Sequence, residues 1–206
     1  MARPRDTRVD AAILTATRAL LAESGYAKLT VDSVAERAGI GKAAIYRRYA
    51  TRQEMVFAAA VHGADLPAPP DTGSLLGDLT ALVREICDHM THPAALAAVP
   101  GLLADVRSSP ELAARFHEAF VTRQQQGVGR LLDRAVVRGE LPAPPDTELV
   151  HALVSGPVFA VLYLQSRTVA GLPEQLARVV HTALTAAEGA AEGAAEGAVQ
   201  GPAAKG

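Results

Sequence analysis

The chain has 206 residues and a net charge of −2, with 49% hydrophobic and 20% charged residues, which is typical of a globular protein with a sizeable core. No apolar run approaches the ~18 residues that a membrane-spanning helix requires, and residues 1–10 lack the apolar core of a signal peptide. A single cysteine, Cys87, excludes an intrachain disulfide and fits a reducing compartment. We therefore expect a cytoplasmic protein without a membrane partner.

Charge is unevenly distributed along the chain. Residues 1–56 carry ten of the 20 Lys/Arg and six of the 22 Asp/Glu residues, a net +4, so the remaining residues carry a net −6. A basic first quarter on an acidic body indicates that the N-terminal part contacts a polyanion, although an asymmetry of this size is common by itself.

Apolar residues recur with helical spacing throughout, and no convincing alternation of the strand type occurs. The first apolar stripe predicts a helix that stops at Gly25, because glycine favours helix ends. Thr30 precedes "VDSVAERAG" and is expected to cap a short helix, which Gly39 ends.

The rest of the chain also has the caps, breaks and apolar spacing of helices. A short helix is expected over 42–49, and Thr51 is expected to cap the next helix, with Glu54 completing a capping box. The proline-rich segment 65–74 is the best candidate for a boundary. Such segments with short connections predict an all-α fold whose later helices form a bundle. The expected later helices cover residues 75–91, 94–107, 110–138, 146–167 and 173–187.

The C-terminal segment repeats "AAEG" three times. Each glycine costs a helix about 1 kcal/mol, and no apolar stripe offsets that cost. We expect the last helix to end near Ala187 and residues 188–206 to form a flexible tail.

Residues 30–49 combine the features of a helix-turn-helix. Ala35 is small where a second helix crosses, Gly39 supplies the backbone angles of a tight turn, and Ile45 fills the space between the two helices. The helix over 42–48 is then the recognition helix of a DNA-binding motif. Its basic side chains supply charge for phosphates or guanine: Lys42, Arg47 and Arg48.

The stretch "LTVDSVAERAGIGKAAIYRRYATRQEMV" resembles the N-terminal helix-turn-helix of the tetracycline-repressor family of transcriptional regulators, most specifically in "AGIGKAAIYRRYATRQE". The resemblance implies an all-helical homodimer that binds operator DNA and releases it when a small molecule enters a C-terminal pocket. It also implies that Tyr49 packs in the core. The DNA-binding residues that it implies are Thr30, Lys42, Tyr46, Arg48 and Arg52. The slim, basic face of the recognition helix adds Ala43, Ala44 and Arg47.

Two positions depart from the family pattern, because Gly41 and Ala44 stand where the family often has hydroxyl residues. The departure removes two expected DNA interactions and a helix cap, and it leaves methyl groups that can meet a thymine methyl. The alternative is that the basic residues form an ordinary solvated face. "GIGK" also resembles the end of a phosphate-binding loop, but the required earlier glycine is Glu36 and Ala43 replaces the Ser/Thr, so nucleotide binding is not expected.

An effector pocket is expected in the later helices, where aromatic and polar side chains recur with helical spacing. The alternative is that these residues form ordinary core. A metal site at Cys87, His89 and His92 is disfavoured, since Cys87 points about 200° away from His89 on a helix. We expect neither a metal nor a cofactor. The candidate pocket residues are Ile86, His89, Met90, Phe116, Phe120, Gln124, Phe159 and Tyr163.

The last two helices are predicted to form a two-fold dimer surface, because small residues on the first of them allow close approach of a partner. Intrachain packing of the same faces is the alternative. The candidate dimer residues are Ala152, Ser155, Gly156 and Ala160, with a second stripe of Leu176, Val179, Val180, Ala183 and Leu184.

These features predict a one-component transcriptional regulator, most often a repressor in the family that the chain resembles, with duplex operator DNA and an unidentified small-molecule effector as partners. We expect a DNA-binding domain at 1–53, an effector-binding and dimerisation domain at 54–187, and the tail. An enzyme is disfavoured, since Ser155 in "LVSGP" lacks the first glycine of a nucleophile elbow. A dimeric DNA-binding protein without an effector remains open.

Overall fold

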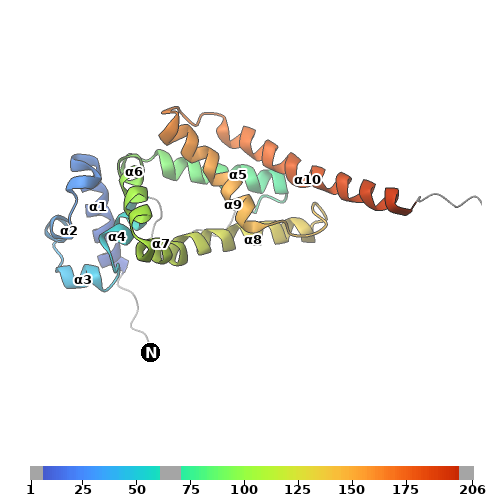
Figure 1. Cartoon of the computed structure of the whole chain (residues 1–206). Coiled ribbons are helices and arrows are strands. Elements are labelled where there is room, and N and C mark those ends of the chain that lie inside the picture. Colours follow the sequence, from blue (N-terminus) through green and yellow to red (C-terminus); the bar gives the residue numbers. More distant parts are fainter. Residues whose placement is uncertain (1–6, 61–70, 200–206) are drawn as a thin grey trace, which may run out of the picture. The chain divides into compact units, whose positions relative to one another are not determined.

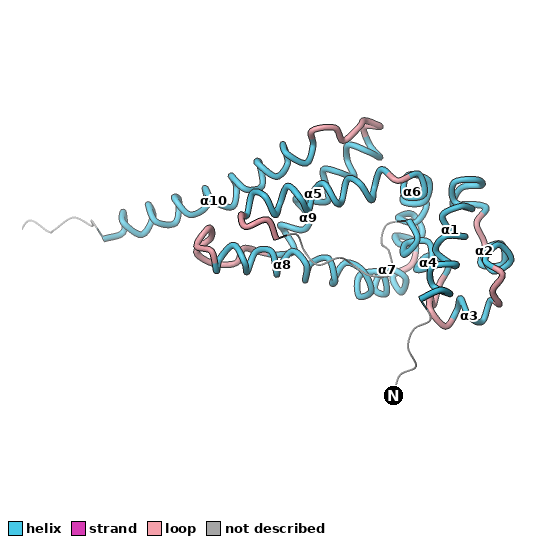
Figure 2. Tube along the Cα trace, turned by 180° about the vertical axis from the view of Figure 1, so that it is seen from behind, coloured by secondary structure: helices cyan, strands magenta, loops and turns pink. Residues whose placement is uncertain are grey.

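The computed structural model of the chain describes residues 7–60 and 71–199, with side chains described as far as Ala186. Every regular element within these ranges is a helix, which confirms the predicted all-α class (Figure 2). The chain divides into two compact units, residues 1–68 with 86–123 and residues 69–85 with 124–206. Residues 65–70 of the predicted proline-rich boundary lie outside the described ranges.

The first unit contains four N-terminal helices and the segment 86–123. The N-terminal helices are α1 (Thr7–Lys28), α2 (Val31–Ala38), α3 (Lys42–Tyr46) and α4 (Arg52–Ala60), and the later ones are the end of α5 (Leu75–Thr91), α6 (Pro93–Ser108), α7 (Pro110–Phe116) and the π-helix η1 (His117–Val121) (Figure 1). The core of this unit is apolar, because each helix turns one stripe inward. Fully buried side chains include Ile13, Leu21, Val34, Ile45, Met55 and Leu102.

The caps that start and stop these helices agree with the sequence prediction. Thr30 accepts from the Ser33 N–H at 3.0 Å, and Ser33 Oγ accepts from the Thr30 N–H at 3.1 Å, so a capping box begins α2. Gly39 ends α2 in the left-handed region, with φ 65°. Gly25 leaves the helical region at φ 75°, and one further turn carries α1 to Lys28.

The start of α4 differs in one detail from the expected capping box. Thr51 Oγ1 accepts from the Glu54 N–H at 3.1 Å, as predicted. The Glu54 carboxylate, however, accepts from the Ala50 N–H at 2.8 Å, one residue before the cap. The recognition helix also ends earlier than expected, at Tyr46, after which Arg48 and Tyr49 continue in turns bonded to the Ile45 carbonyl.

The second unit contains the start of α5 together with α8 (Thr122–Val137), α9 (Thr147–Phe159), the π-helix η2 (Ala160–Leu164) and α10 (Leu172–Val199). The predicted helix 110–138 is therefore divided by η1, and the predicted helix 146–167 ends in η2. The core of this unit is again apolar, with fully buried side chains that include Leu75, Leu79, Val83, Leu131, Leu132, Val154 and Val158.

A buried carboxylate fastens α5 to the end of α8 within the second unit. Asp78 is 0% exposed and accepts from the Thr72 N–H at 2.6 Å and from the Thr72 hydroxyl at 2.8 Å. Arg138 donates to its other oxygen at 3.1 Å. Burial alone would raise the pKa of Asp78, but the Thr72 hydrogen bonds and the Arg138 charge outweigh burial and lower it.

Two sequence expectations about the C-terminal half need correction. Residues Thr147–Leu164 are long and apolar enough to cross a membrane by length and composition, with a mean hydropathy of 1.5, because an average over 18 residues tolerates Glu148 and His151. Only 17% of that window is buried in the protomer.

In addition, α10 does not end near Ala187 but continues through the repeat to Val199. Alanine and glutamate are strong helix formers, and they extend a helix already nucleated by packed turns.

Candidate nucleic-acid interface

The helix-turn-helix is formed by α2, the turn at 39–41 and α3. The Ile40 N–H donates to the Ala35 carbonyl at 3.0 Å, which closes the turn after Gly39. Ala35 is 8% exposed and Ile45 is 1% exposed, so the two helices pack through these side chains as predicted. No side chain caps α3, because Gly41 stands at its N-cap, as expected from the missing hydroxyl.

The outer face of α3 carries four exposed residues: Lys42, Ala43, Tyr46 and Arg47. Tyr46 is 54% exposed, which is unusual for an aromatic residue unless a partner covers it. The Lys42 Nζ lies 2.6 Å from the Asp32 carboxylate, but both side chains are more than half exposed, so this pair is weak and can be exchanged for another anion. Ala44 is half-buried, and Thr30, exposed at the start of α2, uses its hydroxyl as the cap.

Arg48 does not lie on this outer face, in contrast to the sequence prediction. Its Nε is 2.6 Å from the Asp10 carboxylate, and the two side chains are only 14% and 9% exposed. Its Nη1 donates to the Ala44 carbonyl at 3.1 Å. Asp10 in α1 is far away in sequence from the motif, so the spacing of residues within 30–49 gave no sign of this pair.

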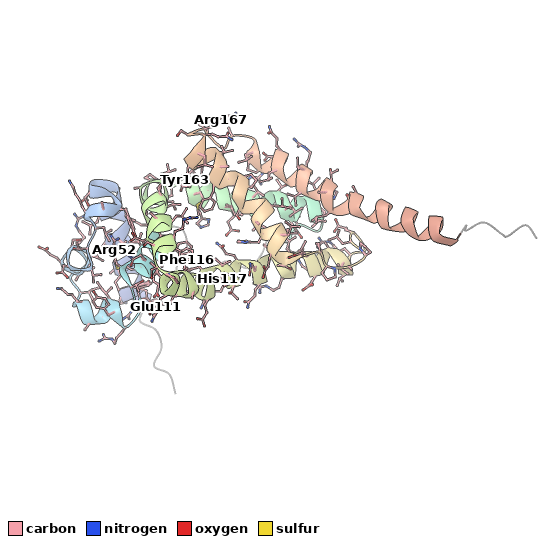
Figure 3. All side chains as sticks on the ribbon, viewed as in Figure 1. Arg52, Glu111, Phe116, His117, Tyr163 and Arg167 are labelled. Carbon is pink, nitrogen blue, oxygen red and sulfur yellow. The ribbon has the colours of Figure 1, made fainter. Side chains whose placement is uncertain are left out.

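Arg52 is also used inside the protein rather than on the outer face (Figure 3). Its Nη1 donates to the carbonyls of Tyr26 and Leu29 at 3.0 and 3.1 Å, and its Nη2 lies 3.0 Å from the Asp105 carboxylate. The guanidinium carbon stands 4.3 Å from the centre of the Tyr26 ring. Arg52 therefore links α4, the end of α1 and α6, and its predicted phosphate contact stays a prediction.

Asp105 of α6 is the acceptor at the centre of this link. Its Oδ2 accepts from the Tyr26 hydroxyl at 2.6 Å and from the Gln53 amide at 2.8 Å, besides Arg52. The hydrogen bond from Tyr26, followed by that from Gln53, lowers the pKa of Asp105, so the carboxylate is ionised at neutral pH. The helix that precedes α7 is thus bonded directly to the helices on both sides of the motif.

Residues around the other candidate sites have specific structural roles. Tyr49 packs against Leu14, Ala58 and Ala59, which confirms its predicted core position. His92 Nδ1 accepts from the Ala94 N–H at 3.3 Å and caps α6. Among the residues that the structure describes, no group of three or more His, Cys, Asp or Glu side chains is arranged to hold a metal ion.

The candidate pocket residues are distributed over both units, so a single pocket formed by all of them stays a prediction. Ile86, His89, Met90, Phe116 and Phe120 belong to the first unit, and Gln124, Phe159 and Tyr163 belong to the second. Phe116 and Phe120 pack on Phe57 of α4, with ring centres 4.4 and 4.1 Å away. In the second unit, Phe159 and Tyr163 stack with centroids 5.7 Å apart, and burial raises the pKa of Tyr163 to about 12 (Figure 3).

Two residues that the sequence did not single out complete these groups. Phe57 joins the pair from α4, and His151 of α9 hydrogen-bonds Gln124 of α8, with Nε2 and Oε1 3.0 Å apart. Burial lowers the pKa of His151, so its imidazole is neutral at physiological pH. In the sequence each was only an isolated aromatic residue or histidine on a predicted helix. Such residues occur in the cores of most proteins, so they did not indicate a site.

The candidate dimer residues divide by exposure. Leu176 and Val180 are 9% and 2% exposed, so they pack inside the protomer and are not available to a partner. Their neighbour Val179 is 66% exposed. Ala152 and Gly156 of α9 are exposed, and the half-buried residues are Ser155 of α9, Ala160 of η2 and Leu184 of α10. The sequence missed two exposed apolar residues of α9, Leu149 at 57% and Leu153 at 39%.

An all-helical chain with a capped helix-turn-helix near its N-terminus, followed by a set of longer helices, has the architecture of a DNA-binding transcriptional regulator. Comparison with known proteins identifies the family. A model described as bacterial regulatory proteins of the tetR family matches residues 13–59, and a model described as tetracyclin repressor-like, C-terminal domain, matches residues 69–183. The chain belongs to the tetracycline repressor family.

Individual relatives agree with this assignment. An uncharacterized HTH-type transcriptional regulator of Mycobacterium tuberculosis is 35% identical over 154 residues, which cover 74% of this chain and 73% of the relative. The crystal structure of the TetR family transcription regulator SCO0332 has the same fold, with a TM-score of 0.67 and 22% identity over 86% of this chain and 96% of that one. A third, FadR of Bacillus subtilis in complex with stearoyl-CoA, has a TM-score of 0.58 at 16% identity and covers 84% of this chain and 97% of that one.

The chain is therefore a helix-turn-helix transcriptional regulator that binds DNA. Members of its family are ligand-responsive repressors that bind operator DNA as dimers.

Proposed function

We propose that this regulator is a cytoplasmic homodimeric repressor that binds operator DNA through α3 and releases it when a small molecule binds among the later helices. The observation that carries the DNA-binding part is the exposed face of α3, where Tyr46 is 54% exposed between Lys42 and Arg47. Lysine and arginine bind phosphates or guanine, and a tyrosine hydroxyl donates to a phosphate. Thr30 is proposed to touch a phosphate, and Ala43 and Ala44 to meet base edges.

The interface is tested with a duplex selected from random DNA by the wild-type protein. We expect binding that weakens steeply with salt, because each phosphate contact releases counterions. Lys42→Ala and Arg47→Ala should each weaken binding and reduce the slope of log K against log salt by about 0.9 for each phosphate that the variant no longer neutralises. Arg130→Ala, which removes the same charge from an exposed position on α8, is the matched control. A wild-type protein that selects no duplex refutes the proposal.

A homodimer is supported by the exposed apolar surface of α9 and α10. Leu149 and Leu153 lie one helical turn apart on α9, and Val179 is exposed on α10. Exposed apolar side chains on neighbouring turns are typical of an interface, and in this family a second copy of the chain is the occupant with two-fold symmetry. A dimer presents two recognition helices to two operator half-sites.

Light scattering tests the dimer. Leu153→Glu should convert the dimer to a monomer and weaken operator binding, because a charge would be buried without a partner. Val137→Glu on α8 is the control, since Val137 is 88% exposed and lies outside α9 and α10. If Leu153→Glu leaves the mass of the particle unchanged, this surface is not the interface.

Ligand responsiveness is supported by the direct bonding of α6 to the motif through Asp105. The model for the C-terminal family domain covers α6, and Asp105 bonds to Tyr26 of α1 and Arg52 of α4. A displacement of α6 therefore acts on both sides of the helix-turn-helix. A ligand screen by thermal shift tests the proposal, because a bound effector raises the unfolding temperature and should lower the affinity for DNA. Ligands that raise the unfolding temperature without affecting DNA affinity would favour an effector-independent regulator.

A further inference from the structure

The recognition helix needs anchors outside itself. It has five residues, Lys42–Tyr46, and its N-cap Gly41 offers no side-chain hydrogen bond. Helices shorter than about 12 residues are marginal in water, so tertiary contacts determine whether α3 is helical and how it is oriented. Ile45, 1% exposed, is one such contact. An apolar side chain fixes the depth of a helix more than its rotation, so a contact at a second point is needed as well.

Arg48 provides that second contact, in an ion pair with α1. Its Nε lies 2.6 Å from Asp10 in the first turn of α1, and its Nη1 donates to the Ala44 carbonyl at 3.1 Å, within α3 itself. One planar guanidinium therefore joins the last turn of the recognition helix to the start of α1. Only 14% of the Arg48 side chain and 9% of the Asp10 side chain are exposed.

The nearby pair of Lys42 and Asp32 shows the contrast. These side chains are 57% and 68% exposed, and water can replace either partner. Lys42 can leave Asp32 for a phosphate at little cost. Arg48 is less free to leave Asp10, because both side chains are largely buried and water does not replace either partner readily.

We propose that Arg48 is a positioning residue, which orients α3 through Asp10 and does not bind the DNA. This inference rests on the DNA-binding function of the chain and assigns the role of one pair within it. Removal of the pair lowers the fraction of protein in which α3 is correctly placed, and the apparent dissociation constant rises by the inverse of that fraction. The interactions within the complex are unchanged, so the same factor applies at every salt concentration.

Neutralisation of Asp10 should change the affinity for DNA in opposite directions, depending on whether Arg48 binds a phosphate or positions α3. If Arg48 bound a phosphate, Asp10→Asn would remove a competing negative charge and strengthen DNA binding. If Arg48 positions α3, the same substitution weakens binding. Asp32→Asn is the matched control, since it removes an acidic partner from the exposed pair and should leave binding equal or stronger.

The experiment measures the affinity of each variant for a duplex that the wild-type protein selects from random DNA, over a range of salt concentrations. We expect Asp10→Asn to weaken binding about tenfold, by a ratio independent of salt, as for a correctly placed population of about one tenth. Binding equal to or stronger than wild type overturns the proposal. So does a salt slope that Arg48→Met reduces by about 0.9, the value for one phosphate, because this substitution removes the charge.

Variants that keep the fold make the outcome independent of stability. A buried ion pair can often be replaced by apolar residues of similar volume without a decrease in stability, so Asp10→Leu with Arg48→Met should melt like the wild type. A folded double variant that binds the duplex more weakly than the wild type, with an unchanged salt slope, supports the proposal, because the pair is lost but no phosphate contact is. Wild-type affinity or a reduced salt slope contradicts it. If the double variant does not fold, the sign of the Asp10→Asn effect decides: weaker binding supports the proposal, and equal or stronger binding overturns it. Failure of the wild type to select any duplex would instead refute DNA binding.

Discussion

Gly101 of α6 lies where another helix comes too close for any side chain. A Cβ atom at this position would be 2.4 Å from Cδ1 and 2.9 Å from Cε1 of the Tyr26 ring. Replacement of a helical glycine by alanine normally stabilises a helix by about 1 kcal/mol. At Gly101 alanine should instead destabilise the protein. The Tyr26 ring cannot easily move away, because its hydroxyl is bonded to the Asp105 carboxylate at 2.6 Å and Arg52 lies against the ring.

The expected size follows from the competing effects. Overpacking of this kind costs about 1–3 kcal/mol. Displacement of the ring also weakens a hydrogen bond worth about 0.5–1.5 kcal/mol and a cation–π contact of about 0.5–1 kcal/mol. After subtraction of the helix gain, Gly101→Ala should lower the free energy of unfolding by about 1–4 kcal/mol, which corresponds to roughly 2–10 °C in Tm for a chain of this length.

Thermal unfolding followed by circular dichroism measures this change. Gly129→Ala in α8 is the matched control, since its Cβ would meet only Thr147 atoms at 3.8 Å, so that variant should be as stable as the wild type or more stable. In a Tyr26→Ala background the ring is gone, and Gly101→Ala should then stabilise the protein. If Gly101→Ala raises Tm in the wild-type background as much as Gly129→Ala does, the close approach of α6 to Tyr26 is wrong.

Two further predictions concern titrating groups. Asp78→Asn should lower the free energy of unfolding by about 2–3 kcal/mol at neutral pH, because it removes the fully buried carboxylate and leaves Arg138 only the more exposed Glu140 and Asp71, whereas Asp133→Asn at an exposed position should not. The pKa of Asp78 is lowered by folding, so its contribution is present above the unfolded value of 3.8 and disappears as pH falls through the folded value, and urea titrations should show an acid destabilisation that Asp78→Asn lacks. Burial, and then the bond to Asp105, raise the pKa of Tyr26, so its contribution is present below pH 10 and disappears as pH rises through the folded value. Tyr26→Phe should cost about 1 kcal/mol at neutral pH and should reduce the alkaline destabilisation, and equal alkaline destabilisation in both proteins would refute this role.

Local features of the fold could be predicted from the sequence because their causes are local. The cap at Thr30 and the left-handed turn at Gly39 depend only on residues a few positions away. Threonine is preferred at a helix N-cap, and glycine is preferred where the backbone turns left-handed. The pair between Arg48 and Asp10 could not be predicted in this way. A basic residue after a recognition helix has the same local pattern whether an acid from α1 is buried against it or not.

The same reasoning explains the C-terminal half. Helical spacing at α10 shows which residues are apolar but not which side of the stripe meets the rest of the protomer, so Val180 and Val179 were indistinguishable. The structure separates them, at 2% and 66% exposed. Similarly, Phe116 and Phe120 have the spacing of a pocket wall, but their neighbour Phe57 comes from α4, which no pattern within residues 110–138 indicates.

The positive charge of residues 1–56 is therefore a poor measure of the charge that meets DNA. Much of this charge is used within the protein. A guanidinium that is paired with a buried carboxylate or carbonyl stays in place, because its departure from a largely buried partner costs free energy. Fewer cations per protomer then remain for phosphates, and the electrostatic part of the affinity scales with the number of phosphates contacted. The proposed dimer would double these contacts, provided that each short recognition helix is correctly placed. The arginines that are held within the protein are Arg18 by the Ala59 carbonyl, Arg48 by Asp10 and Arg52 by Asp105.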